Sequence, residues 1–161
     1  MNRTTLKDLA VALNLSINTV SRALRDMPDI KDETKQIIKA AADKMGYRTN
    51  LAASMLRTNR SRAIGVIVSD LANPVFSGMV KGIGFGVKKA NYSMILSDSN
   101  ESYEEEVSAV ANMYQRNVDG FILFPTMVKD GTVRELLEKK VPFVLVGRKF
   151  HDITTNLVMV N

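Results

Sequence analysis

The chain has no cysteine and a single histidine, His151, among its 161 residues. Disulfide bonds and thiolate metal sites are therefore excluded, and one histidine cannot form the imidazole cluster that many metal sites use. The composition thus predicts a protein without a metal centre.

Long apolar runs are also missing. The first five residues, Met1-Asn2-Arg3-Thr4-Thr5, lack the apolar core of a signal peptide. No apolar run approaches the roughly 20 residues that a membrane-spanning helix needs. From these absences we expect a cytoplasmic protein that has no membrane partner.

Acidic residues are scarce in one part of the chain only. The formal net charge is +5, but residues 1–62 hold 12 Lys and Arg against 6 Asp and Glu, whereas residues 63–161 hold 10 against 11. An ordinary solvated basic surface would not show this asymmetry. A basic surplus confined to the N-terminal segment favours binding to phosphates, with an affinity that depends on salt.

Two short apolar periodicities lie in that basic segment. Apolar residues recur at three- and four-residue steps, as one face of a helix requires. They are Leu6, Leu9, Ala10 and Leu13 in a first helix and Leu15, Val20, Ala23 and Leu24 in a second. Between them, Asn14 suits a left-handed turn and Ser16 suits the N-cap of the second helix. The spacing predicts a helix-turn-helix, which places a helix in the major groove of DNA.

The outward face of the second helix has the chemistry of a DNA-reading surface. Its side chains are Ile17, Asn18, Ser21, Arg22 and Arg25. Their amide, hydroxyl and guanidinium groups suit base edges and phosphates. The alternative is a small helical hairpin packed in a larger core.

A third helix is expected over residues 32–45, with Asp32 and Glu33 in its first turn and Gly46 just past its end. Its buried stripe is expected to consist of Ile37, Ile38, Ala41 and Met45. Residues 1–48 then form a DNA-binding domain with a small core. Residues 49–62 are interpreted as a short hinge helix, over residues 50–57, and a polar linker. A helix that short orders only against a partner.

From Ala63 onward, apolar runs alternate with helical patterns. Strands buried in a parallel sheet are expected at 63–69, 93–97, 120–125 and 142–147, and helices at 74–90, 103–116 and 132–139. Residues 157–161 have the pattern of another strand. Asn73-Pro74 is a strong helix start, since Asn caps a helix and Pro fits its first position. The alternation predicts a doubly wound α/β layer over residues 63–161.

Ligands bind such sheets beyond the carboxyl ends of the strands. The residues expected to line an effector cleft there are Ser69, Asp70, Asn73, Phe76, Asp98, Phe124 and Arg148. The Phe76 ring suits stacking on a sugar face, while Asp or Arg suits hydroxyls or a charged group. Loop capping or packing is the alternative role for each of them.

A glycine-rich segment and a run of three glutamates could suggest catalysis, but we interpret both as structural. The glycines of residues 82–86 lack the G-x-G-x-x-G spacing and lie inside a predicted helix, so a nucleotide loop is rejected and no cofactor is expected. Gly78, Gly82 and Gly86 recur every four residues, which indicates close approach of that helix face to the sheet or to a second subunit. Residues Glu104 to Glu106 are expected to form an exposed first helical turn, not a catalytic pair.

Four segments together resemble the lactose/galactose repressor (LacI/GalR) family of bacterial transcription regulators. They are TLKDLA from Thr5, SINTVSRAL from Ser16, MGYRTN from Met45 and IGVI from Ile64. The Thr-Val-Ser-Arg core followed by Gly-Tyr-Arg-x-Asn is highly specific, and the similarity covers essentially the whole chain.

The resemblance implies roles for individual residues. Ile17, Asn18 and Arg22 match the positions that read bases in the major groove. The positions that match phosphate-binding residues are Thr5, Ser16, Thr19, Ser21, Thr34, Tyr47 and Asn50. Leu56 matches a leucine that wedges into the minor groove. The chain departs from the family at Asn14, where glycine is usual, and at Lys31, where a small hydroxyl residue is common and where the lysine either contacts phosphate or is solvated.

The resemblance also implies a function. We expect a non-enzymatic repressor, located at the bacterial nucleoid, that binds a near-palindromic double-stranded DNA operator as a homodimer. A small effector, a sugar or sugar derivative, would control it, and a protein corepressor stays open.

The family's chains are longer than this one. Residues 63–161 are therefore interpreted as the N-terminal part of a periplasmic-binding-protein-like effector and dimerisation domain without its C-terminal subdomain, in a fragment or a truncated protein. The alternatives are a truncated member that binds DNA without effector control, and a sugar-binding protein or sugar-handling enzyme of similar fold.

Overall fold

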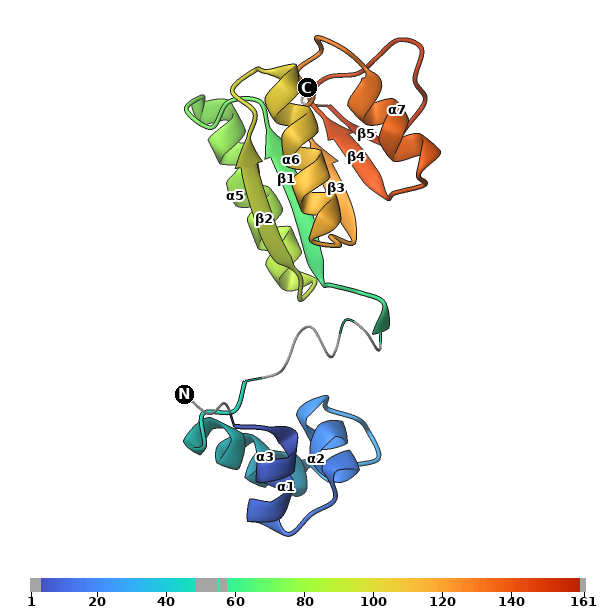
Figure 1. Cartoon of the computed structure of the whole chain (residues 1–161). Coiled ribbons are helices and arrows are strands. Elements are labelled where there is room, and N and C mark those ends of the chain that lie inside the picture. The colour runs from blue at the N-terminus through green and yellow to red at the C-terminus, as the bar shows by residue number, and fades with distance from the viewer. Residues whose placement is uncertain (1–3, 49–54, 56–57, 160–161) are drawn as a thin grey trace. The chain divides into compact units, whose positions relative to one another are not determined.

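The structure is a computed structural model that describes residues 4–48, 55 and 58–159. It divides into two compact units, Met1–Leu51 and Ala52–Asn161. Each unit has a hydrophobic core of its own. In Figure 1 the first unit is coloured blue to teal and the second runs from green to red.

Within its described residues, 4–48, the first unit has three helices (Figure 1). They are α1 (Leu6–Leu13), α2 (Ile17–Leu24) and α3 (Asp32–Lys44). Leu9, Val20 and Ile38 are fully buried at the centre, and every apolar position predicted for the first two helices lies in this core or packs against it. The predicted helix-turn-helix fold is confirmed.

The turn between α1 and α2 has the predicted local chemistry. Asn14 adopts a left-handed φ of 52°, and the N–H of Leu15 donates to the carbonyl of Ala10 at 2.9 Å. Asn tolerates this φ better than most residues that carry a side chain, which explains how the turn forms without glycine. Ser16 Oγ then accepts the N–H of Thr19 at 3.0 Å and caps α2.

The core side of α3 corrects one prediction. Ile37 is 55% exposed, whereas Ile38 is fully buried and Ala42 is buried one turn later. Successive residues of a helix point about 100° apart, so the stripe through Ile38 and Ala42 turns Ile37 toward solvent. The helix ends as predicted: Gly46 has a left-handed φ of 64°, and the N–H of Tyr47 donates to the carbonyl of Ala42 at 2.8 Å.

The second unit is a parallel α/β layer. Its strands are β1 (Ala63–Val68), β2 (Ser93–Asp98), β3 (Gly120–Leu123), β4 (Phe143–Val146) and β5 (Leu157–Val158), and its helices are α5 (Pro74–Lys89), α6 (Tyr103–Gln115) and α7 (Gly131–Glu138). The strands lie in the order β2-β1-β3-β4-β5, and every pair is parallel. Asn73 caps α5 by accepting the N–H of Val75 at 3.0 Å, with Pro74 at the first helical position. The doubly wound fold is confirmed.

Helices cover both faces of this sheet (Figure 1). On one face, α6 and α7 pack over Ile67 of β1 and Leu145 of β4. On the other face, α5 packs over Val66 and Val68 of β1. Alternate residues of β1 thus belong to different cores, which is why this strand is an unbroken apolar run.

Strand β2 differs from the prediction of a strand buried in the sheet. It lies at the edge of the sheet, where it pairs with β1 alone. Leu96 is 38% exposed, and Ser93 at the start of the strand is exposed. A local apolar run cannot reveal whether its strand is central or at an edge, because that depends on strand order.

Two kinds of feature are absent from the part of the chain that the structure describes. No helix there is long and apolar enough to cross a membrane. No group of three or more His, Cys, Asp and Glu side chains there could hold a metal ion.

Candidate nucleic-acid interface and effector site

The exposed side of α2 carries the three side chains expected to read bases, which we name the recognition face (Ile17, Asn18 and Arg22). Ile17 is 49% exposed, and Asn18 beside it is exposed in the first turn of the helix. Arg22 lies four residues after Asn18, so these two side chains are neighbours on the helix surface. The structure brings the three residues to one side of α2, and their contact with bases stays a prediction.

Several residues assigned to phosphates have structural partners in the helical unit. The hydroxyl of Thr5 accepts the Asp8 N–H at 3.3 Å and Asp8 Oδ2 accepts the Thr5 N–H at 2.8 Å, which together form a capping box at the start of α1. The Thr5 hydroxyl also donates to Asp8 Oδ2 at 2.8 Å. The hydroxyls of Ser16 and Thr19 share a hydrogen bond of 2.8 Å. The half-buried members of the set are Thr19, Ser21, Thr34 and Tyr47, and Asn50 lies outside the described residues. The phosphate contacts of the whole set stay predictions.

Asp29 is a partner of the recognition face that sequence reasoning missed. It lies in the loop between α2 and α3, where its Oδ2 accepts a hydrogen bond from Arg22 Nε at 2.8 Å and its Oδ1 lies 2.6 Å from Arg22 Nη2. A second carboxylate of this loop, Asp26, accepts a hydrogen bond from Lys39 Nζ at 2.6 Å. Arg22 and Asp29 are 7 positions apart in the sequence, and Asp26 and Lys39 are 13 positions apart. Both aspartates lie in the loop and not on a helix, so no helical periodicity marks either pair.

The predicted hinge helix lies mostly outside the described residues. Leu56 is among those that the structure does not describe. At the end of the segment, the N–H of Asn59 donates to the carbonyl of Met55 at 2.8 Å, which is one helical hydrogen bond. The minor-groove role of Leu56 stays a prediction.

The linker that follows is fastened to the sheet by Asp119, which also was not predicted. Its carboxylate accepts the N–H and hydroxyl of Ser61 at 2.8 and 2.9 Å and the N–H of Arg62 at 3.1 Å. Burial raises the pKa of Asp119, but the hydrogen bonds outweigh it and hold the pKa below its ordinary value. The start of β1 is thereby tied to the residue that precedes β3.

Three of the seven candidate effector residues meet in one cluster at the carboxyl ends of the strands. The rings of Phe76 and Phe124 pack edge to face, with centroids 5.6 Å apart and planes at 73°. The guanidinium of Arg148 lies 5.9 Å from the centroid of the Phe76 ring, within the range of a cation–π contact. Phe124 is almost fully buried, so Phe76 and Arg148 are the partly exposed members.

Arg148 is held by two further groups. Its Nη1 and Nη2 donate to the two carboxylate oxygens of Glu101 at 2.9 and 2.7 Å, and Nη1 also donates to the carbonyl of Pro125 at 3.0 Å. The hydrogen bond from Arg148 lowers the pKa of Glu101, and the same bond raises the pKa of Arg148. Sequence reasoning does not identify Glu101, because it lies three residues past the end of β2 and no local pattern shows that it pairs with Arg148, 47 positions away.

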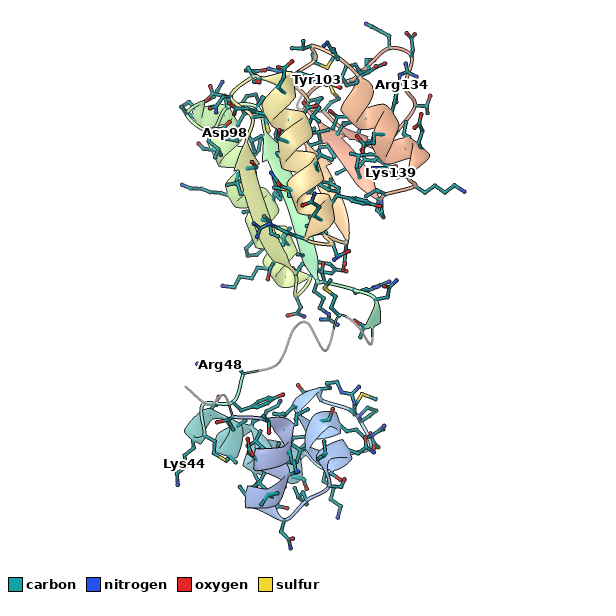
Figure 2. All side chains as sticks on the ribbon, viewed as in Figure 1. Lys44, Arg48, Asp98, Tyr103, Arg134 and Lys139 are labelled. Atoms are coloured by element: carbon teal, nitrogen blue, oxygen red, sulfur yellow. The ribbon has the colours of Figure 1, made fainter. Side chains whose placement is uncertain are left out.

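The other four candidates lie at the same carboxyl end of the sheet, and the side chains of Asp70, Asn73 and Asp98 are already engaged. Figure 2 labels Asp98 at this end of the sheet, where β2 ends, and Tyr103, where α6 begins. The side-chain oxygens accept backbone N–H groups, from Ala72 at 2.8 Å for Asp70, from Val75 at 3.0 Å for Asn73, and from Leu71 and Asn100 at 2.9 and 3.0 Å for Asp98. Ser69 is fully buried. These bonds are the loop capping given as the alternative role, and effector contacts by this group stay a prediction.

Glu106 corrects the prediction of a fully exposed acidic turn. Glu104 and Glu105 are exposed, but Glu106 is 1% exposed, and its Oε2 accepts the N–H of Thr126 at 2.8 Å. Glu106 lies one turn before Val110, which packs on the sheet, so the helical period turns it inward. It therefore ties α6 to the loop that follows β3.

The three glycines that recur every four residues in α5 do not approach the sheet. A Cβ atom at Gly78, Gly82 or Gly86 would meet no atom of the described residues within 4 Å. Close approach to the sheet, one of the two predicted explanations, is therefore wrong. On the same helix Phe85 is 74% exposed and Val75 is 59% exposed. Approach to a second subunit stays a prediction.

The chain thus combines a helix-turn-helix unit, a fold typical of DNA-binding domains, with a parallel α/β unit that follows it in the sequence. Residues 5–50 match the family model described as bacterial regulatory proteins, lacI family. The chain carries a LacI-family helix-turn-helix domain at its N-terminus, and it corresponds to the N-terminal half of the regulators that it matches.

Relatives and solved structures agree with this assignment. Catabolite control protein A of Priestia megaterium is 31% identical over 143 residues, which cover 89% of this chain and 43% of that protein. A LacI-family transcriptional regulator from Silicibacter pomeroyi has a TM-score of 0.80 at 26% identity, over 98% of this chain and 47% of its own. The lac repressor dimer bound to operator and the anti-inducer ONPF has a TM-score of 0.76 at 26% identity, over 91% and 45%. The chain thus spans less than half the length of these proteins.

Proposed function

We propose that this chain is part of a transcription repressor that binds a near-palindromic double-stranded operator as a homodimer. The observation that carries the proposal is the capped helix α2, which exposes Ile17 and Asn18 and carries the partly exposed Arg22 beside them. This helix belongs to the unit that matches the lacI family model. Amide and guanidinium groups suit base edges in the major groove, where each base pair presents a distinct pattern. The lac repressor, a structural relative, is a dimer bound to operator.

Phosphate contacts and a minor-groove wedge complete the proposed DNA interface. The proposed phosphate-binding residues are Thr5, Ser16, Thr19, Ser21, Thr34, Tyr47 and Asn50, and the wedge is Leu56. Thr5 and Ser16 support this because they cap α1 and α2, and a helix N-terminus attracts phosphate. The excess of 12 basic over 6 acidic residues in positions 1–62 supports it further.

The effector that we propose is a small carbohydrate bound at the carboxyl ends of the strands. Phe76 offers a partly exposed ring of the kind that stacks on the C–H face of a sugar. Arg148 lies beside this ring and pairs with Glu101, and the two side chains supply donors and acceptors for hydroxyl groups. Binding would change DNA affinity by favouring one of two conformations of the repressor.

The homodimer in this proposal uses the outer face of α5. Phe85 and Val75 expose apolar surface there, and the neighbouring glycines leave room for close approach of a second chain. The proposed role requires a location in the cytoplasm, at the bacterial chromosome.

A selection experiment tests the proposal. The full chain is mixed with a pool of random-sequence duplexes at physiological salt, and bound DNA is amplified and sequenced. We expect a near-palindromic consensus for the wild type and a different consensus for Asn18→Ala. The matched control Asn112→Ala removes an exposed amide from α6 and should leave the consensus unchanged. A bound pool with the composition of the starting pool would contradict the proposal.

A further inference from the structure

The Arg22 side chain is fixed by a carboxylate from outside its own helix. Its Nε donates to Asp29 Oδ2 at 2.8 Å, and its Nη2 lies 2.6 Å from Asp29 Oδ1. Two oxygens of one carboxylate thus face two nitrogens along one edge of the planar guanidinium, an arrangement that fixes its plane as well as its position. The Arg22 side chain is still 34% exposed.

The pairing leaves the other edge of the guanidinium available. The group has five N–H donors, and Asp29 occupies the Nε side. Nη1 has no partner among the described residues, so the Nη1–Nη2 edge keeps the parallel donors that match O6 and N7 of guanine. One edge can therefore hold the carboxylate while the adjacent edge, which uses the second N–H of Nη2, reads a base.

The negative charge of Asp29 is consistent with a role in selecting bases and not in binding phosphates. A carboxylate beside a surface that binds a polyanion weakens attraction to phosphates at any sequence. It also offsets the charge of Arg22, so the arginine gains less from charge alone and more from hydrogen bonds of defined direction. Asp29 thus favours a correct base over an incorrect one at the expense of binding to random DNA.

We propose that Asp29 is a positioning residue for Arg22, which orients the guanidinium for a guanine and so sets the specificity of the recognition face. The inference rests on the proposed function, since it requires that Arg22 contacts a base. The pair is ionised at neutral pH, because the hydrogen bond between the two groups lowers the pKa of Asp29 and raises that of Arg22.

The chain supplies a matched control in the same loop. Asp26 also pairs with one basic side chain, but that side chain is Lys39 of α3 and not a member of the recognition face. Asp26→Asn and Asp29→Asn each remove one negative charge and weaken one exposed ion pair. A general charge effect would make the two variants behave alike.

The experiment measures dissociation constants of the full chain for the duplex that the wild type selects and for a scrambled duplex of equal composition. We expect Asp29→Asn to reduce the ratio between the two by about fivefold to thirtyfold, part of the discrimination that one bidentate base contact provides. Binding of this variant to the scrambled duplex should be unchanged or tighter. Asp26→Asn should leave the ratio within about twofold of the wild type, while circular dichroism shows both variants folded.

A double-mutant cycle with Arg22→Ala separates positioning from other effects. If Asp29 acts through Arg22, Asp29→Asn has no further effect on the ratio in the Arg22→Ala background. A loss of discrimination in Arg22→Ala without any loss in Asp29→Asn would overturn the inference and leave the proposed function standing. Equal ratios for Asp29→Asn and Asp26→Asn would also overturn it. A wild type that selects no sequence would remove the proposed function, and the inference with it.

Discussion

Ser61 donates two hydrogen bonds, from its N–H and from its hydroxyl, to the same Oδ1 of Asp119, which lies 58 positions further along the chain. The N–H of Arg62 donates to the other oxygen of that carboxylate. These three bonds join the linker to the end of the sheet where β1 and β3 begin. A change in the position of β3 would therefore move the residues that lead back toward the proposed hinge.

Removal of this carboxylate should destabilise the α/β unit. Asp119→Ala leaves the three donors without their acceptor, and we expect the free energy of unfolding to fall by about 1–3 kcal/mol. Asp119→Asn keeps one side-chain oxygen and should lose less. Urea unfolding of both variants measures the difference, with Asp152→Ala as a control that removes an exposed carboxylate of the same unit. A control that loses as much stability as Asp119→Ala would rule out a specific role for these bonds.

Asp119 should also contribute to the acid sensitivity of the unit. Its pKa in the folded chain is below the ordinary value of 3.8, so the unfolded chain takes up the proton first as pH falls. The stabilisation is then fully present near neutral pH and is lost as pH falls from about 5 through the pKa of the folded state. The wild type should lose more stability over this interval than Asp119→Asn, whose side chain does not titrate. Parallel pH profiles of the two proteins would show that the carboxylate makes no such contribution.

The buried carboxylate of Glu106 provides a second test of stability. Glu106→Ala leaves the N–H of Thr126 buried without its acceptor, and we expect a loss of about 1–3 kcal/mol in the free energy of unfolding. Glu106→Gln keeps an oxygen that can accept this bond and should lose less. Thermal and urea unfolding measure both, and equal losses in the two variants would mean that the hydrogen bond does not account for the effect.

Substitution of Phe85, the exposed aromatic residue on α5, tests the proposed homodimer. We expect Phe85→Glu to weaken self-association by at least about tenfold, because it introduces a charge at the proposed contact. Leu137→Glu, at an exposed apolar position of α7, is the matched control and should leave association unchanged. Sedimentation equilibrium of the full chain measures both. A wild type that stays monomeric at every concentration, or equal weakening in both variants, would contradict the assignment of α5.

The features that the sequence reveals best depend on residues close together in the chain. Asn14 and Ser16 specify the turn and the cap of α2 through their own conformations and hydroxyl chemistry, and the apolar steps of α1 and α2 follow one helical period. The strands and helices of the second unit can be predicted for the same reason, because each follows a local pattern of apolar residues. Their alternation also predicted the parallel sheet, since crossover connections require it.

The features that could not be predicted depend on distant parts of the chain. Arg22 was expected on the recognition face, but nothing local showed that Asp29 would fix it. The burial of Glu106 depends on which face of α6 meets the sheet, and the exposure of β2 depends on the order of the strands. The contacts that hold the candidate sites in place are the ones that only the folded chain reveals.

The most direct test of the account is the ratio of two dissociation constants at physiological salt, for the selected near-palindromic duplex and for a scrambled duplex of the same composition. The account predicts that the full chain binds the selected duplex at least about a hundredfold more tightly, because the proposed base contacts of the recognition face form only with the correct sequence, whereas phosphate contacts form with any sequence. Equal affinity for the two duplexes, with the same dependence on salt, would contradict it.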